Sequence, residues 1–198
     1  ARRDRKTDHL GGVIIAVKDS IVGNDLYRQT SAELTAASIQ CPGEQQLIVV
    51  AAYRPPSSNL EYMMEMKEKI THLYRVYPKA TVWVAGDINL PDIDWNDNTI
   101  VSNQYNHSIS HQFLDLIYDT GSEQMVKFPT RGPNTLDLFV TNRPTLVTRS
   151  KPMPGVSDHD VVFIETNAQA TKRKPPRRKI LLWNKMDYEE TRSAVSSM

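Results

Sequence analysis

Short apolar runs rich in β-branched residues recur along this chain, and they constrain its fold more than any other feature. The stronger runs cover residues 13–17, 47–53, 81–85, 136–140, 146–149 and 161–164, and weaker strand candidates cover 25–30 and 33–39. Such runs, bounded by polar or proline-containing turns, are typical of strands. Because strands must bury an apolar face against another layer, the order predicts an α/β (α+β) sandwich of mixed sheets with helices outside, rather than a regular βαβ repeat.

Two amphipathic helices are predicted between these strands. Apolar residues follow helical spacing over residues 60–77, and Ser58 with Glu61 resembles a capping box at the start of that helix. Its methionines and tyrosines fit a stripe that faces the core better than a binding stripe. Ser110 is expected to cap a second helix, which closes near Gly121.

The chain divides into three parts by composition. Residues 1–168 are predicted to form one domain, since 198 residues suit a single domain with a short appendage. Residues 169–181 contain a run of basic residues interrupted by two prolines, which is typical of an extended linker. Residues 182–198 are expected to begin a following helical segment.

Charge and cysteine usage limit the possible partners and compartments. The net charge is +1, so any affinity for nucleic acid must come from local basic patches. The single cysteine excludes an internal disulfide, as expected in a reducing compartment. No segment has the apolar length of a signal peptide or a membrane span. We therefore expect an intracellular protein, nuclear or cytoplasmic, that is neither secreted nor bound to a membrane.

Three acidic signatures follow one another down the second half of the chain, each next to a strand-like run. They contain Asp87 with Asn89, then Asp137, then Asp158 with His159. Any one of these aspartates alone would more often be a turn or cap residue, but their order and setting favour a common site. We interpret them as part of a metal-assisted phosphodiesterase site.

The chemistry of phosphodiester cleavage explains why these residue types would occur together. Asp158 is a hard oxygen ligand suited to Mg²⁺, and His159 beside it can bind a phosphate. Asp137 can accept the other ring proton of His159 and fix its orientation. Asp87 can align or deprotonate a water, and Asn89 faces the same side of an extended segment.

The same segments resemble a known family. The sequences GDINLP at 86–91, IDW at 93–95, TLDLFVTN at 135–142 and GVSDH at 155–159 are similar to signatures of the endonuclease/exonuclease/phosphatase superfamily. The closest resemblance is to the endonuclease domains of non-LTR (LINE-type) retrotransposon reverse transcriptase proteins. GGV at 11–13 and AYRPP at 52–56 fit the upstream strands of that group.

The resemblance implies a fold, an activity and a set of site residues. The fold is a four-layer sandwich of two mixed β-sheets flanked by helices, and the activity is DNA nicking with Mg²⁺ (or Mn²⁺). Tyr53 would contact the phosphate, Asp87 and Asn89 would position the water and phosphate, Asp137 would orient His159, and Asp158 would contribute to the metal site. The expected partner is DNA, with no membrane, no small-molecule cofactor and a monomeric domain.

Two departures from the family pattern leave other functions open. Family members begin with a strand bearing an asparagine and a strand ending in the glutamate that is the principal metal ligand, and this chain starts after both; Glu33 lies in a later strand. Pro56 stands where repair-type members carry asparagine. The alternatives are a catalytically inactive remnant that binds nucleic acid, or a small-phosphoester phosphatase of the same superfamily. Arg131 fits either a DNA-backbone contact or a plain turn.

Overall fold

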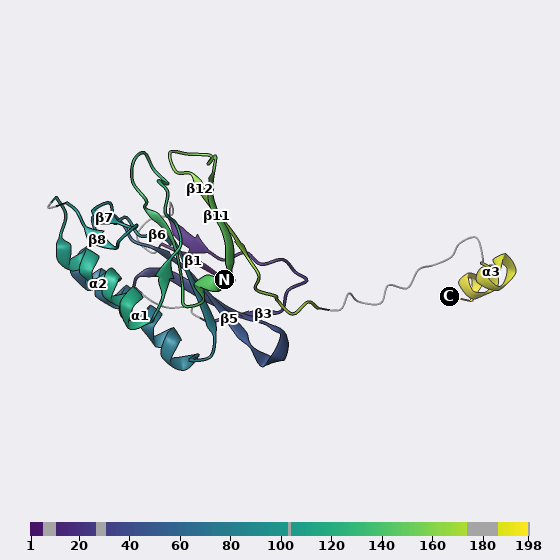
Figure 1. Ribbon diagram of the computed structural model, residues 1–198. Helices are drawn as coiled ribbons and strands as arrows, with labels where there is room; N and C mark the ends of the chain where they lie inside the picture. The colour runs from purple at the N-terminus through teal and green to yellow at the C-terminus, as the bar shows by residue number, and fades with distance from the viewer. Residues whose placement is uncertain (6–10, 27–30, 103, 174–185, 198) are drawn as a thin grey trace.

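A six-stranded mixed sheet forms the centre of the protein (Figure 1). The structure is a computed structural model that describes residues 1–5, 11–26, 31–102, 104–173 and 186–197. In spatial order the strands are β3 (Gly23–Asp25), β4 (Glu33–Gln40), β5 (Gln46–Tyr53), β6 (Thr81–Asp87), β10 (Asp137–Thr141) and β9 (Glu123–Gln124). Only the β5–β6 pair is parallel.

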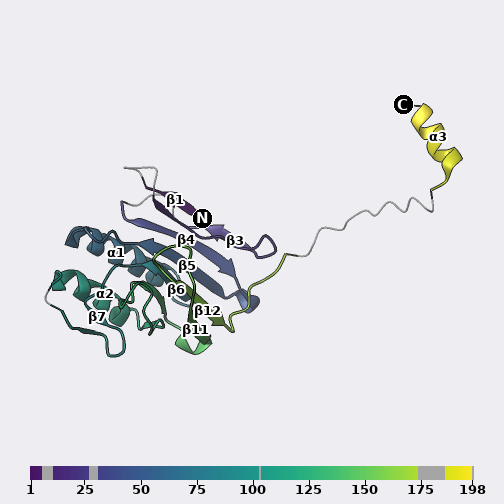
Figure 2. The ribbon, with the colours of Figure 1, turned by 90° about the horizontal axis from the view of Figure 1, so that it is seen from above.

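Two helices cover one face of this sheet (Figures 1 and 2). Because β5 and β6 are parallel, the chain must cross over between them, and α1 (Leu60–Val76) makes that crossover. The second helix, α2 (His107–Asp119), packs beside α1. The sheet contributes alternate residues to the shared core, as the period of a strand requires. These residues and their main helical partners are Ile48, Val50, Val82, Val84, Leu138, Val140, Met63, Met66, Ile70, Leu73, Phe113 and Leu116.

Smaller elements border the opposite face of the sheet. One hairpin pairs β1 (Arg2–Asp4) with β2 (Gly12–Ile14) and contacts β4 and β5, and a second pairs β11 (Val147–Met153) with β12 (Val161–Thr166). The Trp83 and Phe139 rings lie 5.7 Å apart. They alternate with the core residues of β6 and β10 and therefore lie on the sheet face opposite the helices. The remaining elements are β7 (Ile93–Asp94), β8 (Thr99–Ile100), the 3-10 turns Pro42–Glu44 and Pro144–Leu146, and α3 (Tyr188–Ser196).

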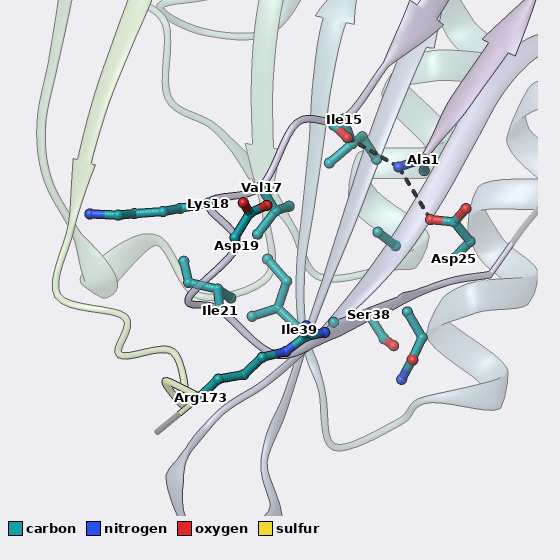
Figure 3. A pocket seen from close by; sticks show the side chains of 13 residues that line it. Ala1, Ile15, Val17, Lys18, Asp19, Ile21, Asp25, Ser38, Ile39 and Arg173 are labelled. Carbon is teal, nitrogen blue, oxygen red and sulfur yellow. Dashed lines mark hydrogen bonds and ion pairs between the residues drawn. The ribbon is translucent and has the colours of Figure 1, made fainter. Parts of the chain in front are cut away.

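The first hairpin is fixed to the sheet near Ala1 (Figure 3). The Ala1 amine donates to the Ile15 carbonyl at 3.1 Å and lies 3.2 Å from an Asp25 carboxylate oxygen. Beside these contacts is a cavity of about 310 Å³, which Ile39 and Arg173 help to line. The cavity therefore lies between the hairpin, the sheet edge and the end of the domain.

The predicted α/β class, with a mixed sheet flanked by helices, is confirmed. The predicted strand 33–39 corresponds to β4, which is buried along nearly its whole length. The strand expected over 13–17 is shorter and ends at Ile14. On the face opposite the helices, the described residues form the two separate hairpins in place of one continuous second sheet. No further described strand pairs with either hairpin.

The predicted helix starts were wrong by one and four residues. Asn59, not Ser58, caps α1 and accepts a hydrogen bond from the Tyr62 amide at 3.1 Å. Asn106 caps α2, and Ser110 lies inside that helix, where its hydroxyl donates to the buried Asp92 carboxylate. Asparagine caps as well as serine does, so the sequence offered two nearby cap candidates at each start and did not rank them.

Several expectations fall on residues that the structure does not describe. The candidate strand 25–30 lies outside the described residues over 27–30, and the linker 169–181 lies outside them from residue 174 onward. The segment 182–198 contains α3 among its described residues. The division at residues 168 and 181 stays a prediction. None of the described helices has the length and apolar character needed to cross a membrane.

Candidate active site

Two aspartates face each other across neighbouring strands, where β6 ends and β10 begins. Asp137, the first residue of β10, is the register partner of Asp87, the last residue of β6. Because side chains alternate along a strand, both lie on the face opposite the helices, in line with Trp83. Directly opposed residues of an antiparallel pair have Cβ atoms about 5 Å apart. The sheet register alone therefore brings the two carboxylates together.

Gly86 allows β6 to end in this position. Its φ is +144°, and a Cβ built there would lie 1.8 Å from the Ala52 carbonyl oxygen of β5. No L side chain fits such an approach, so the glycine before Asp87 is required by the contact between the two strands. The approach also allows the Arg54 amide to donate to the Asp87 carbonyl at 2.9 Å.

Asn89 is held rigidly beside Asp87 by a buried arginine. The guanidinium of Arg54 donates to the Ile88 carbonyl at 2.8 Å and to the Asn89 carbonyl at 2.7 Å. In return the Asn89 side-chain amide donates to the Arg54 carbonyl at 3.0 Å. Asn89 has φ +53°, a left-handed conformation that asparagine tolerates, and its backbone amide donates to Asp87 Oδ1 at 3.1 Å. Asn89 therefore supports the Asp87 carboxylate directly.

His159 reaches the aspartate pair from the loop before β12. Its Nδ1 lies 2.8 Å from Asp137 Oδ2, and both side chains are about three-quarters buried. Gly155 gives this loop its shape, because a Cβ there would lie 1.8 Å from the His159 carbonyl oxygen. The hydrogen bond to Asp137 fixes the ring and directs Nε2 away from that carboxylate.

Burial and charge perturb this cluster. Burial raises the pKa of Asp87 above its ordinary value of 3.8, and the nearby Asp137 carboxylate raises it further. His159 and the hydrogen bonds from Asn89 oppose that rise. Burial lowers the pKa of Arg54, and the carboxylates of Asp87 and Asp92 counter the effect. A carboxyl group with a raised pKa in such a cluster is typical of functional sites.

The cluster fits a divalent cation. One ligand atom from each of Asp87, Asp137 and His159 lies within 4.8 Å of the others, and this is the one group of its kind among the described residues. Mg²⁺ is commonly held by one or two protein carboxylates, and Mn²⁺ prefers similar ligands. A cavity of about 380 Å³ borders the cluster between β10 and β12 and leaves room for a substrate group.

Tyr53 lies in the same row of side chains, on the neighbouring strand. Parallel pairing of Ala51 with Ala85 places Tyr53 next to Asp87 on the sheet face opposite the helices. Glu33 pairs with Tyr53 in the register of β4, so the row extends across four strands. The Glu33 carboxylate, however, is bound to the Arg5 guanidinium at 2.7 Å, which also lies over the Tyr53 ring. Glu33 is therefore occupied by an ion pair and is not part of the three-residue cluster.

Asp158 points elsewhere. Its Oδ2 lies 2.7 Å from a guanidinium nitrogen of Arg131, and its side chain is 64% exposed. The structure thus brings Asp87, Asn89, Asp137 and His159 together, with Tyr53 beside them, but does not bring Asp158 into the same group.

Arg54 and Asp92 are buried charged residues beside the cluster to which the motifs in the sequence assign no role. Arg54 is 5% exposed and Asp92 is 1% exposed, which is rare for charged side chains unless they have partners. The available signal for Arg54 was its position, directly after a predicted strand and directly before two prolines. Asp92 lies in a polar loop with Asp94 and Asp97, and no local pattern distinguishes the buried carboxylate from the other two.

A carboxylate–histidine cluster beside a cavity on a mixed α/β fold is compatible with the hydrolysis of phosphate esters. The sequence family described as endonuclease-reverse transcriptase matches residues 47–163, more than half of the chain, and the chain belongs to this family. It is a member of the endonuclease/exonuclease/phosphatase superfamily, whose members hydrolyse nucleic acids or other phosphoesters. A comparison with curated protein sequences gave no match.

Solved structures show partial similarity in fold. A 3′ phosphatase, NExo, from Neisseria bound to a product DNA hairpin has a TM-score of 0.47 and 10% identity, over 75% of this chain and 80% of that one. The human Nocturnin catalytic domain with bound sulfate has a TM-score of 0.44 and 12% identity, over 73% and 59%. Truncated Caenorhabditis elegans TDP2 has a TM-score of 0.41 and 11% identity, over 74% and 66%. The family assignment therefore rests on the sequence match, not on these structures.

Proposed function

We propose that this chain hydrolyses phosphodiester bonds of DNA with the help of Mg²⁺ (or Mn²⁺), as the nicking endonuclease of a retroelement. The observation that carries the proposal is the hydrogen bond between His159 and Asp137 next to the opposed Asp87 carboxylate. Membership of the endonuclease-reverse transcriptase family supports DNA as the substrate class. The basic residues from position 172 onward add charge that suits a polyanion.

Asp87 and Asn89 prepare the nucleophile in this proposal. Asp87 accepts a proton from the attacking water, and its raised pKa makes the carboxylate a stronger base than an ordinary aspartate. The Asn89 backbone amide holds one Asp87 oxygen, which leaves the other free for the water. Because Arg54 fixes the Asn89 carbonyl, the water is aligned by groups that need not reorganise during the reaction.

His159, Asp137 and Tyr53 act on the phosphate in this proposal. Asp137 holds the His159 ring through Nδ1, so that the ring, when it carries both protons, can donate from Nε2 to a phosphoryl oxygen. Tyr53, next to Asp87 in the row, can donate its hydroxyl to another phosphoryl oxygen. These donors would stabilise charge that develops on the phosphoryl oxygens during cleavage.

A bound divalent cation supplies charge neutralisation at the phosphoryl and leaving oxygens. Asp87 and Asp137 are the residues whose oxygens would hold it in the geometry described above. Asp158 can join them only if it leaves Arg131, because the same Oδ2 now lies 2.7 Å from that guanidinium. Exposed ion pairs of this kind contribute little to stability, so the exchange costs little.

One observation favours a second candidate, a domain that binds nucleic acid without cutting it. In the three-residue cluster the Asp137 carboxylate is already hydrogen-bonded to His159. Asp158 lies outside the cluster, in an ion pair with Arg131. Mg²⁺ demands near-octahedral oxygen ligation, and the hydrogen bond of Asp137 to His159 leaves Asp87 as the one carboxylate of this cluster that is not paired with the histidine. Both candidate functions therefore predict binding of nucleic acid, but only the first predicts its cleavage.

A plasmid-nicking assay separates the candidates. We expect the chain to convert supercoiled DNA to the open-circular form in Mg²⁺ or Mn²⁺ and to stop in EDTA. The Asp87→Asn variant should lose this activity, whereas Asp119→Asn, an exposed helix carboxylate paired with Lys67, should retain it. Equal nicking by wild type and Asp87→Asn would contradict the proposal, and binding without nicking by every protein would support the second candidate. Hydrolysis of inositol phosphates without DNA cleavage would instead indicate a small-phosphoester phosphatase.

A further inference from the structure

Two adjoining cavities form one groove that leads away from the candidate active site. Their volumes are about 350 Å³ and 410 Å³, and the residues that they share are Arg54, Pro56, Asn89, Pro91 and Tyr105. Asn89 belongs to the groove and also donates to Asp87, so the groove begins at the cluster described above. A substrate held by the cluster would have its neighbouring atoms in this groove.

We infer that this groove binds an unpaired, single-stranded segment of DNA next to the scissile phosphate, with Tyr105 stacking on a base and Arg131 contacting a phosphate. The inference rests on the proposed function, and it adds the conformation of the substrate and two positioning residues. Neither residue belongs to the cluster, and neither was assigned a definite role by the sequence.

Tyr105 has the exposure of a stacking platform. It is 51% exposed although it lines both cavities, so one part of the side chain contacts the groove wall while another part remains open. An aromatic ring in this position offers a flat surface that any unpaired base can cover. Bases inside a duplex are already stacked on each other, so this contact selects an unpaired base.

Arg131 gives the groove a positive charge that can be redirected. Its side chain is 50% exposed, and its guanidinium is paired with the exposed Asp158 at 2.7 Å. The turn from Arg131 to Asn134, closed by hydrogen bonds in both directions, holds the backbone of Arg131 at the groove wall. A phosphate can replace Asp158 at little cost, because both partners of the pair are in contact with water.

The remaining charges of the groove also suit a polyanion. Among the described residues that line it, the only carboxylate belongs to Asp92, which is 1% exposed and accepts hydrogen bonds from Ser110. No exposed acidic side chain of this lining would therefore repel a phosphate. Arg54 lies under the groove, and the amides of Asn59, Asn106 and Asn134 offer donors along its walls.

The test is binding of a fluorescein-labelled single strand of twelve thymidines, measured by fluorescence anisotropy in EDTA so that cleavage cannot interfere. We expect Tyr105→Ala to raise the Kd at least about tenfold and Tyr105→Phe to leave it within about twofold, because stacking needs the ring and not the hydroxyl. Arg131→Ala should also weaken binding and lower the slope of log K against log salt by about 0.7. A duplex of the same length should bind less tightly and be unaffected by Tyr105→Ala.

Matched controls make the result specific. Tyr118 is 87% exposed on α2, and Arg149 forms an exposed pair with Glu165 at 2.9 Å, so Tyr118→Ala and Arg149→Ala should bind like wild type. The inference is overturned if Tyr105→Ala binds like Tyr118→Ala, or if Tyr105→Phe loses as much as Tyr105→Ala. Because binding is measured without metal, a chain that binds through Tyr105 but never nicks would contradict the proposed function while supporting this inference.

Discussion

Asp87 and Asp137 are directly opposed in the register of β6 and β10, so two carboxylates meet where a cross-strand pair would normally avoid like charges. The nearby His159 offsets part of the repulsion through its hydrogen bond to Asp137. A fold selected only for stability would place a neutral or opposite partner there. The arrangement fits the proposed role of this pair in holding a cation.

The first prediction concerns the free-energy cost of placing the Asp87 and Asp137 carboxylates opposite each other. Asp87→Asn should raise the free energy of unfolding at pH 7 by about 0.5–2 kcal/mol while it abolishes nicking, since it removes a partly buried charge opposite Asp137. Urea denaturation in EDTA measures the effect. A variant that is less stable than wild type at pH 7 would show that the Asp87 carboxylate stabilises the fold.

The same substitution should change how stability depends on pH. The pKa of Asp87 is higher in the folded chain than its ordinary value of 3.8, so the folded state binds more protons between these two pKa values. The free energy of unfolding contributed by this group is therefore present at low pH and is lost as pH rises from about 4 through the folded pKa. Wild type should lose stability relative to Asp87→Asn across that window, and parallel curves for the two proteins would contradict the assignment.

The second prediction concerns the partner of His159. Asp137→Asn keeps the shape of the side chain but replaces the acceptor that holds Nδ1, so nicking should fall by about 10²–10⁴-fold. Folding should change little, which circular dichroism would verify. Asp115→Asn, which removes an exposed carboxylate near Lys67, is the matched control and should retain full activity.

The third prediction concerns the approach of β6 to β5. Gly86→Ala should destabilise the domain by more than about 2 kcal/mol, because the new Cβ would collide with the Ala52 carbonyl. Gly121 also has a positive φ, but a Cβ there would meet nothing within 4 Å. Gly121→Ala should therefore cost only the backbone strain, about 1–2 kcal/mol. Equal losses in thermal unfolding would show that the close contact is not the reason for Gly86.

The fourth prediction concerns Arg54. Arg54→Met should destabilise the domain by about 2–4 kcal/mol and lower nicking as well, because the Ile88 and Asn89 carbonyls lose their donors and Asn89 is freed. Arg75→Met, on the exposed side of α1, should change neither property. Loss of stability with full activity per folded molecule would show that Arg54 supports the fold but not the position of Asn89.

Much of the fold followed from local patterns. The strands at 47–53 and 81–85 and the helix between them were predictable because apolar periodicity, a cap and proline all agreed there. The boundary errors at Ser58 and Ser110 arose because asparagines one and four residues away capped the helices instead, and Ser110 donates to Asp92 from inside α2.

The sequence could suggest members of the candidate site but not their geometry. Asp87, Asn89, Asp137 and His159 could be named because each lies next to a strand, but only the register of β6 and β10 shows that the two aspartates face each other. The pairing of Asp158 with Arg131 depends on two loops that no local pattern connects. Arg54 acts through the backbone carbonyls of Ile88 and Asn89, and no side-chain pattern in the sequence identifies these partners.

The most direct measurement of the central claim is single-turnover nicking of supercoiled DNA in Mg²⁺ by wild type, His159→Ala and His72→Ala. His72 is an exposed histidine of α1, which covers the sheet face opposite to Asp87 and Asp137, and serves as the matched control. The account predicts nicking by wild type and His72→Ala and none above the EDTA background by His159→Ala. Nicking by His159→Ala at the wild-type rate would contradict it.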